Sequence, residues 1–246
     1  MPKNVRIILI LRVVVSFTAC PGILRFPFDL PTKYYKGAWR EANHVTGPCV
    51  LYDPCCGAAY HLSVLACLHW HSFREVIGSD IDQKAVNLAQ KNLGLLSMEG
   101  LDKRISEISE MFRLYGKESH KEALDSAHSL QDRISTLTEE HPLRMRVFQA
   151  SALDSEELRA NLKDVAVDIV FADVPYGLHS QWRDPDSDSG SSLWQMLNAL
   201  LGVLVPTSIV AIVSDKRQKA SHEDYQRIEQ FQVGKRRVVL LKPTSG

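Results

Sequence analysis

Three acidic residues each follow a short apolar segment, and each stands among residues suited to bind a nucleoside. Asp53 opens the stretch DPCCGAAY, in which Gly57 allows a tight turn and the close approach of a ligand to the backbone. Asp80 lies in SDID, where a carboxylate can accept both hydroxyls of a ribose and Ile81 can lie against an adenine ring. Asp173 opens DVPYG, which is the most informative stretch of the chain. Together these residues point to nucleoside binding and to chemistry on a planar base.

The DVPYG stretch combines an acid, a proline and an aromatic ring. Pro175 restricts the backbone of the residue before it, so the platform is rigid. The carboxylate of Asp173 and nearby carbonyls can accept hydrogen bonds from an exocyclic amine, while Tyr176 can stack on a base. The alternative is an ordinary turn with a buried tyrosine. Just past the platform, His179 and Trp182 are candidates to line the substrate cleft.

Asp80 and Asp82 compete for two roles. Either side chain can cap the helix that follows, and we interpret Asp82 as the cap and Asp80, nearer the strand tip, as the ligand. The spacing from Gly57 to Asp80 fits a nucleoside-binding βαβ unit, in which an acid follows the glycine loop by about 20 residues. The dinucleotide fingerprint G-x-G-x-x-G is absent, so a nicotinamide or flavin cofactor is not expected.

These motifs need a sheet that brings strand ends together, and the pattern of apolar segments predicts one. Strands and helices alternate, which favours a mostly parallel, doubly wound α/β sheet with helices on both faces. The expected strands are 49–52, 76–79, 146–149, 167–172 and 208–213, and the expected helices are 58–70, 82–96, 155–162 and 192–203. A final hairpin, 228–233 with 237–241, is expected to add an antiparallel edge strand and gives seven strands.

Two further segments complete a single predicted domain, 1–246. Residues 21–48 are a lead-in with a short helix over 32–43. Residues 100–142 are highly charged and amphipathic and predict an inserted pair of helices, which is either a solvated flap or a substrate-facing element. The apolar segment 5–17 is too short to span a bilayer, and Arg12 within it argues against export.

The composition of the chain excludes some classes of protein and limits how it can bind a charged partner. The 246 residues include 29 Lys plus Arg, 29 Asp plus Glu and 45% hydrophobic residues, which excludes a disordered chain. Because the net charge is zero, any nucleic-acid site must be a local basic patch. Lys216, Arg217 and Lys219 are the expected phosphate contacts, whereas 235–237 fall in a hairpin turn and are interpreted as solvated. The 5 Cys lack a C-x-x-C pair, so we expect a reducing, cytoplasmic setting, no membrane association and no metal site.

Taken together, the motifs resemble those of class I S-adenosylmethionine-dependent methyltransferases with a Rossmann-like fold. The stretches DPCCGAAYHLSVL, SDIDQKAVNLAQKNLGLLS, DIVFADVPYG and VSDKRQK resemble the avilamycin-resistance rRNA methyltransferase family, AviRa, over residues 21–241. The resemblance implies methylation of a guanine in 23S rRNA or the large ribosomal subunit, and protection against orthosomycin antibiotics. Similarity of DVPYG to the D-P-P-Y motif of exocyclic-amine methyltransferases favours N2 of guanine over N1. A monomer is the default expectation.

The resemblance also assigns roles to individual residues. Asp173, Pro175 and Tyr176 would form the catalytic face. The implied cofactor-binding residues are Asp53, Cys55, Gly57, Asp80, Ile81, Ser151, Ala152 and Asp173. Two departures stand out: Ala59 replaces a family glycine, and Ser151 stands where an acid often contacts adenine. The alternatives are a methyltransferase for another nucleic acid or a small molecule, and a catalytically silent RNA-binding protein.

Overall fold

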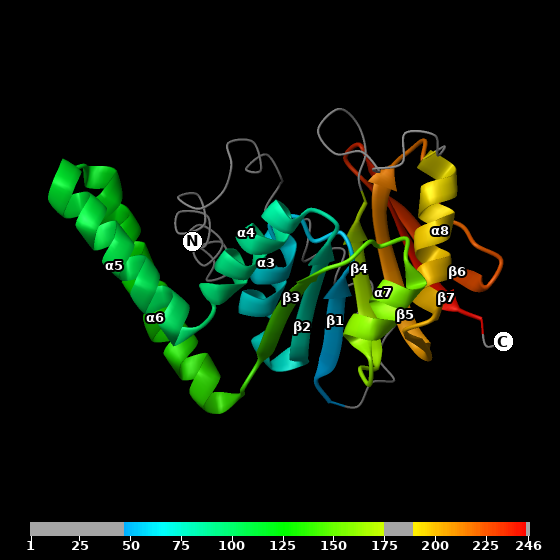
Figure 1. The fold of residues 1–246 in the computed structure, drawn as a ribbon, viewed down its shortest axis with the longest axis horizontal. Coiled ribbons are helices and arrows are strands. Elements are labelled where there is room, and N and C mark those ends of the chain that lie inside the picture. Colours follow the sequence, from blue (N-terminus) through cyan, green and yellow to red (C-terminus); the bar gives the residue numbers. More distant parts are fainter. Residues whose placement is uncertain (1–46, 175–188, 245–246) are drawn as a thin grey trace.

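A seven-stranded sheet is the centre of the computed structural model, which describes residues 47–174 and 189–244 (Figure 1). The strand order is β3-β2-β1-β4-β5-β7-β6. The strands are β1 (Cys49–Asp53), β2 (Phe73–Asp80), β3 (Arg144–Gln149), β4 (Val167–Asp173), β5 (Leu204–Asp215), β6 (Tyr225–Val233) and β7 (Arg236–Pro243). Strands β1 to β5 pair in parallel, so their carboxyl ends share one edge of the sheet. This confirms the predicted mostly parallel α/β sheet.

Helices cover both faces, which explains why the central strands are apolar along their whole length rather than alternating. On one face, α3 (Tyr60–Leu68) and α4 (Gln83–Gly94) pack on side chains such as Leu51 and Phe171. On the other face, α7 (Ser155–Leu162) and α8 (Ser189–Leu201) pack on side chains such as Val170. A short 3-10 helix, Trp70–Ser72, joins α3 to β2.

Two long helices occupy the segment where a helical pair is expected. Helices α5 (Met98–Tyr115) and α6 (Glu118–Glu140) pack against each other and extend beyond the β3 edge of the sheet (Figure 1). The second half of α6 joins the main core through Leu130 and Ile134, whereas Leu114 and Tyr115 at the far end are exposed. None of the helices in residues 47–174 and 189–244 is long and apolar enough to cross a membrane.

The C-terminal hairpin lies at the edge of the sheet, but the order of its two strands was not predicted. The antiparallel strand β7 lies inside the sheet between β5 and β6, and the edge strand among the described residues is β6, which pairs with β7. The hairpin therefore adds an antiparallel edge strand, as predicted, but its two strands enter the sheet in the reverse order. The cause is that the chain skips one position after β5, and the turn at Gly234, with a φ of 60°, returns β7 into the gap. The expected helix 32–43, the apolar segment 5–17 and the platform residues after 174 lie outside the described residues.

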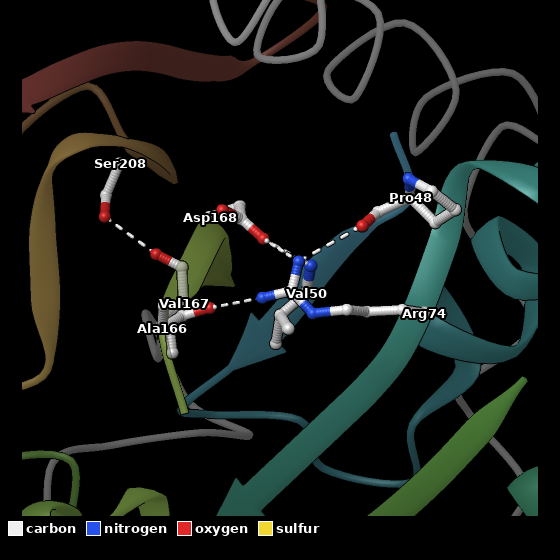
Figure 2. A network of polar contacts seen from close by, with 7 residues as sticks. All are labelled: Pro48, Val50, Arg74, Ala166, Val167, Asp168 and Ser208. Carbon is white, nitrogen blue, oxygen red and sulfur yellow. Dashed lines mark hydrogen bonds and ion pairs between the residues drawn. The ribbon is translucent and has the colours of Figure 1, made fainter. Parts of the chain in front are cut away.

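The amino ends of the strands are joined by a polar network around Asp168 (Figure 2). Asp168 accepts the Val50 amide of β1 at 2.7 Å and forms an ion pair with Arg74 of β2 at 3.0 Å. Arg74 also donates to the carbonyls of Pro48 and Ala166. Three neighbouring strands are thus tied together at the edge opposite to the one where the sequence motifs end.

Candidate active site

The loop after β1 has the backbone shape that a close ligand approach requires. Gly57 has a φ of 52°, and a Cβ added to it would meet no atom within 4 Å, so the loop is open on that side. The amide of Cys56 donates to the Ser79 carbonyl at 2.9 Å, which fixes the loop on β2. The loop leads directly into α3, whose first amides lie at the same edge as the three acidic residues.

Ala59 adopts a left-handed conformation where the resemblance suggests glycine. Its φ is 55° and its ψ is 29° at the N-terminus of α3. Alanine costs about 1 kcal/mol or more in this region, but Ala59 is fully buried and its methyl group contributes about 0.8 kcal/mol in the core. The two terms offset each other, so the loop keeps the left-handed turn without glycine.

Asp53 is buried at the tip of β1, with 2% of its surface exposed. One carboxylate oxygen accepts the Cys55 amide at 3.0 Å. Burial, together with the nearby charges of Asp173 and Asp80, raises the pKa of Asp53 well above its ordinary value. The same burial and carboxylates raise the pKa of the Cys55 thiol, so it stays protonated. A positively charged ligand would relieve this excess of negative charge.

Asp80 holds the loop around Gly57 in place through hydrogen bonds. Its two oxygens accept the Gly57 amide at 3.0 Å and the Asp82 amide at 2.9 Å. Each carboxylate oxygen has a second acceptor site, so Asp80 can hold the loop and accept ribose hydroxyls together. Asp82 accepts the Lys84 amide at 3.0 Å and caps α4, which confirms the predicted cap. Ile81 is 40% exposed beside them, at the place where an adenine ring is expected.

The residues after β3 include a carboxylate that sequence reasoning missed. Ser151 donates its amide to a carboxylate oxygen of Glu157 at 2.7 Å, and its hydroxyl accepts the Leu153 amide at 3.2 Å. The Glu157 carboxylate therefore lies beside Ser151, where related sites often have an acidic residue. Asp154 caps α7 through the amides of Glu156 and Glu157 and is committed to that role. Ala152 is buried next to Ser151.

At the tip of β4, Asp173 is paired with an arginine from β7. The Nη1 atom of Arg236 lies 2.6 Å from both carboxylate oxygens, and the side chains of Asp173 and Arg236 are 14% and 16% exposed. The interpretation of residues 235–237 as solvated is therefore wrong for Arg236. Strand β6 runs parallel to β5, so the hairpin turn returns the chain to the site edge and β7 begins there. That strand direction was the signal that could have located Arg236.

A histidine from the first turn of α3 completes this side of the site. The His61 ring lies edge-on to Phe171 at 5.6 Å. Burial lowers the pKa of His61, the charge of Asp173 opposes this shift, and the charge of Arg236 adds to it. His61 is therefore a neutral imidazole within electrostatic reach of the Asp173–Arg236 pair. No group of three or more potential metal ligands occurs in the described part of the chain, so His61 belongs to no such cluster there.

The structure brings together most of the predicted site residues at one edge of the sheet. Asp53, Gly57, Asp80 and Asp173 lie at the carboxyl ends of three adjacent strands. Lys216, Arg217 and Lys219 are exposed beyond β5 at the same edge, although Arg217 donates to Asp215 at 3.1 Å. The predicted residues Pro175, Tyr176 and Trp182, together with His179, lie outside the described residues.

Comparison with known proteins identifies similar chains. The family model described as rRNA methyltransferase AviRa matches residues 13–236. The 23S rRNA (guanine(2535)-N(1))-methyltransferase of Streptomyces viridochromogenes is 34% identical over 230 residues, which cover 93% of this chain and 89% of that protein.

Solved structures show the same likeness. The rRNA methyltransferase AviRa from S. viridochromogenes superposes with a TM-score of 0.80 at 33% identity, covering 94% of this chain and 89% of that one. TrmN from Thermus thermophilus shares the fold alone, with a TM-score of 0.50 at 17% identity over 87% of this chain and 48% of that chain.

Proposed function

The chain belongs to the AviRa family of rRNA methyltransferases, and from this premise we propose that it methylates N1 of a guanine in 23S rRNA, using S-adenosylmethionine. The observation that carries the proposal is the convergence of Asp53, Asp80 and Asp173 beside the open face of the Gly57 loop. The choice of N1 follows the activity named for the S. viridochromogenes relative and replaces the sequence-based preference for N2.

The residues at the site fit S-adenosylmethionine. The open face of Gly57 allows a ligand to lie against the loop, and Asp80 retains acceptor sites for ribose hydroxyls. Asp53 is buried within electrostatic reach of Asp80 and Asp173, so a sulfonium cation would offset their charge. Ile81 offers exposed apolar surface for adenine, Glu157 beside Ser151 offers an acceptor for its amine, and Ala152 is a sequence-based candidate that is buried next to Ser151. When bound, the cofactor supplies an electrophilic methyl group.

Asp173 is the residue that we assign to the chemistry. Guanine N1 carries a proton that must leave before N1 becomes a nucleophile, and the Asp173 carboxylate can accept it. Pro175 and Tyr176 follow Asp173 in the sequence and remain part of the proposed catalytic face. If the target guanine is paired or stacked, it must be flipped out of its helix to reach this edge.

Exposed cations beyond β5 complete the proposal. Lys216, Arg217 and Lys219 lie at the site edge and would contact RNA phosphates, with Trp182 as a further sequence-based candidate. We propose that one chain acts alone on 23S rRNA or the large subunit. Resistance to orthosomycin antibiotics is the biological consequence implied by the resemblance, and drug susceptibility of a strain expressing the chain tests it.

The experiment that tests the function is labelled-methyl transfer from S-adenosylmethionine to unmodified 23S rRNA, followed by primer extension. A methyl group on N1 blocks base pairing, so we expect a strong stop one nucleotide before the modified guanine. Cofactor binding without transfer to 23S rRNA would point to another acceptor. Tight rRNA binding without cofactor binding would favour a silent RNA-binding protein.

A further inference from the structure

The pairing of Asp173 with Arg236 requires a long reach across the sheet. Asp173 ends β4 and Arg236 begins β7, and β5 lies between them. Two strand spacings amount to about 10 Å, so the arginine side chain must extend over the tip of β5 to place Nη1 at 2.6 Å from both carboxylate oxygens. The hairpin thus places the Arg236 guanidinium beside Asp173, the acid that we assign to the chemistry.

A contribution to the stability of the fold does not by itself explain why Asp173 and Arg236 are paired. Both side chains are mostly removed from water, and the cost of desolvating two charges largely offsets their attraction. The pair also lies within electrostatic reach of His61, whose pKa responds to both charges in opposite directions. The ion pair fixes a hydrogen-bond acceptor, the Asp173 carboxylate, beside a donor, the Arg236 guanidinium, at the edge where a base is expected to enter.

We propose that Arg236 is the residue that recognises guanine O6 beside Asp173, an inference that rests on the function proposed above. Guanine presents the acceptor O6 next to the donor N1–H, which matches the guanidinium and the carboxylate. Adenine reverses the pattern, because its amine would face the guanidinium and its N1 lone pair would face the carboxylate.

The same contact assists the transfer. The N1–H bond breaks and the proton moves to an Asp173 oxygen, while the electron pair stays on the base and is shared between N1 and O6. The guanidinium beside O6 stabilises this negative charge. The N1 pair then forms the bond to the methyl group, and the sulfur keeps the electrons of the bond that breaks. Asp173 returns its proton to water after the product leaves.

The test compares Arg236→Gln with the wild type on 23S rRNA at saturating cofactor. We expect kcat to fall by about 100-fold, the usual loss for one donor to a developing oxyanion, with the Kd for S-adenosylmethionine within twofold of wild type. The defect should shrink as pH rises toward the range in which guanine N1 loses its proton unaided. A structural role would give the same loss at every pH, and that result would overturn the proposal.

Two further variants guard against a folding defect. Arg237→Gln changes the neighbouring arginine on β7 and should keep kcat within twofold. Arg236→Lys keeps the positive charge but lacks the planar fork that can bind a carboxylate and a base oxygen together, so kcat should stay about tenfold low with a normal melting temperature. Full activity of Arg236→Lys would show that charge alone matters and would overturn O6 recognition.

The controls separate this inference from the proposed function. If the wild type transfers no methyl to rRNA, the proposed function fails. If the wild type is active and Arg236→Gln retains its kcat, only the inference about Arg236 fails. A target guanine replaced by inosine keeps O6 and N1–H, so it should remain a substrate with the same dependence on Arg236; loss of that dependence would also overturn the inference.

Discussion

The two edges of the parallel strands carry polar networks of opposite character. At the amino edge, Asp168 is matched by Arg74, and its remaining contact is the Val50 amide, so the charges balance within the protein (Figure 2). At the carboxyl edge, the buried carboxyl group of Asp53 lies within electrostatic reach of Asp80 and Asp173, and Arg236 forms an ion pair with Asp173.

We therefore interpret the network at the amino edge as stabilising the fold and the network at the carboxyl edge as suited to bind a ligand. A network whose charges are satisfied internally gains nothing from a ligand, whereas one with surplus negative charge gains from a cation. The raised pKa of Asp53 records that surplus, since burial and neighbouring carboxylates disfavour its charged form. Substitutions at the two edges should therefore affect different measurements.

Asp80→Ala should produce the largest change in cofactor binding. It removes the brace on the Gly57 amide and the ribose acceptor, and each hydrogen bond to a charged group contributes about 1.5–3 kcal/mol. We expect the Kd for S-adenosylmethionine, measured by calorimetry, to rise about 100-fold. Asp82→Ala is the matched control: it removes a helix cap worth about 1 kcal/mol and should leave the Kd within twofold. Equal Kd values for the two variants would contradict the assignment of Asp80.

At the opposite edge, Asp168→Ala should change stability and leave cofactor binding unaltered. The Val50 amide loses its acceptor and Arg74, which is 47% exposed, loses its partner. The free energy of unfolding in urea should fall by about 2 kcal/mol, a value that allows for the solvent-exposed arginine. A changed Kd for the cofactor in the folded variant would show that the two edges are not independent.

Cofactor affinity should depend on pH through Asp53. Its pKa is raised in the folded chain, so its contribution to stability is present at low pH and is lost as pH rises through the folded pKa. A bound cation favours the ionised carboxylate, so the Kd for S-adenosylmethionine should fall with rising pH, by at most about tenfold per pH unit. Asp53→Asn should bind more weakly and lose this dependence. A pH-independent Kd in the wild type would argue against a cation beside Asp53.

Loss of the exposed cations beyond β5 should have the smallest effect. Lys216→Ala with Arg217→Ala removes two proposed phosphate contacts. The slope of log affinity for rRNA against log salt should decrease by about 1.4, since each of the two contacts to a single strand contributes about 0.7. Arg217 already pairs with Asp215, so a decrease nearer 0.7 would assign the contact to Lys216 alone. An unchanged slope would place the RNA-binding surface elsewhere.

Local patterns were sufficient to predict most of the fold and the acidic part of the site. Apolar segments located the strands, and parallel topology then placed Asp53, Asp80 and Asp173 at one edge. The cap formed by Asp82 followed from its position before α4. These features depend on residues close in sequence and on a general rule of sheet topology.

Features that depend on distant pairings were missed. Arg236 reaches Asp173 only because β7 inserts between β5 and β6, which no local pattern specifies. Glu157 is a local exception: it lies six residues after Ser151, and its contact with the Ser151 amide depends on how the chain turns between β3 and α7. Arg74 and Asp168 are 94 residues apart in the chain and give no sequence signal of their contact.

The most direct test of the separation between the two edges is labelled-methyl transfer to 23S rRNA by Asp173→Asn and Asp168→Asn side by side. Both changes remove one negative charge next to an arginine, so they are chemically matched. We predict that Asp173→Asn loses at least about 100-fold in kcat with its cofactor Kd within a few-fold of wild type, and that Asp168→Asn keeps its kcat at temperatures where it is folded. Full activity of Asp173→Asn, or an equal loss in both variants, would contradict the account.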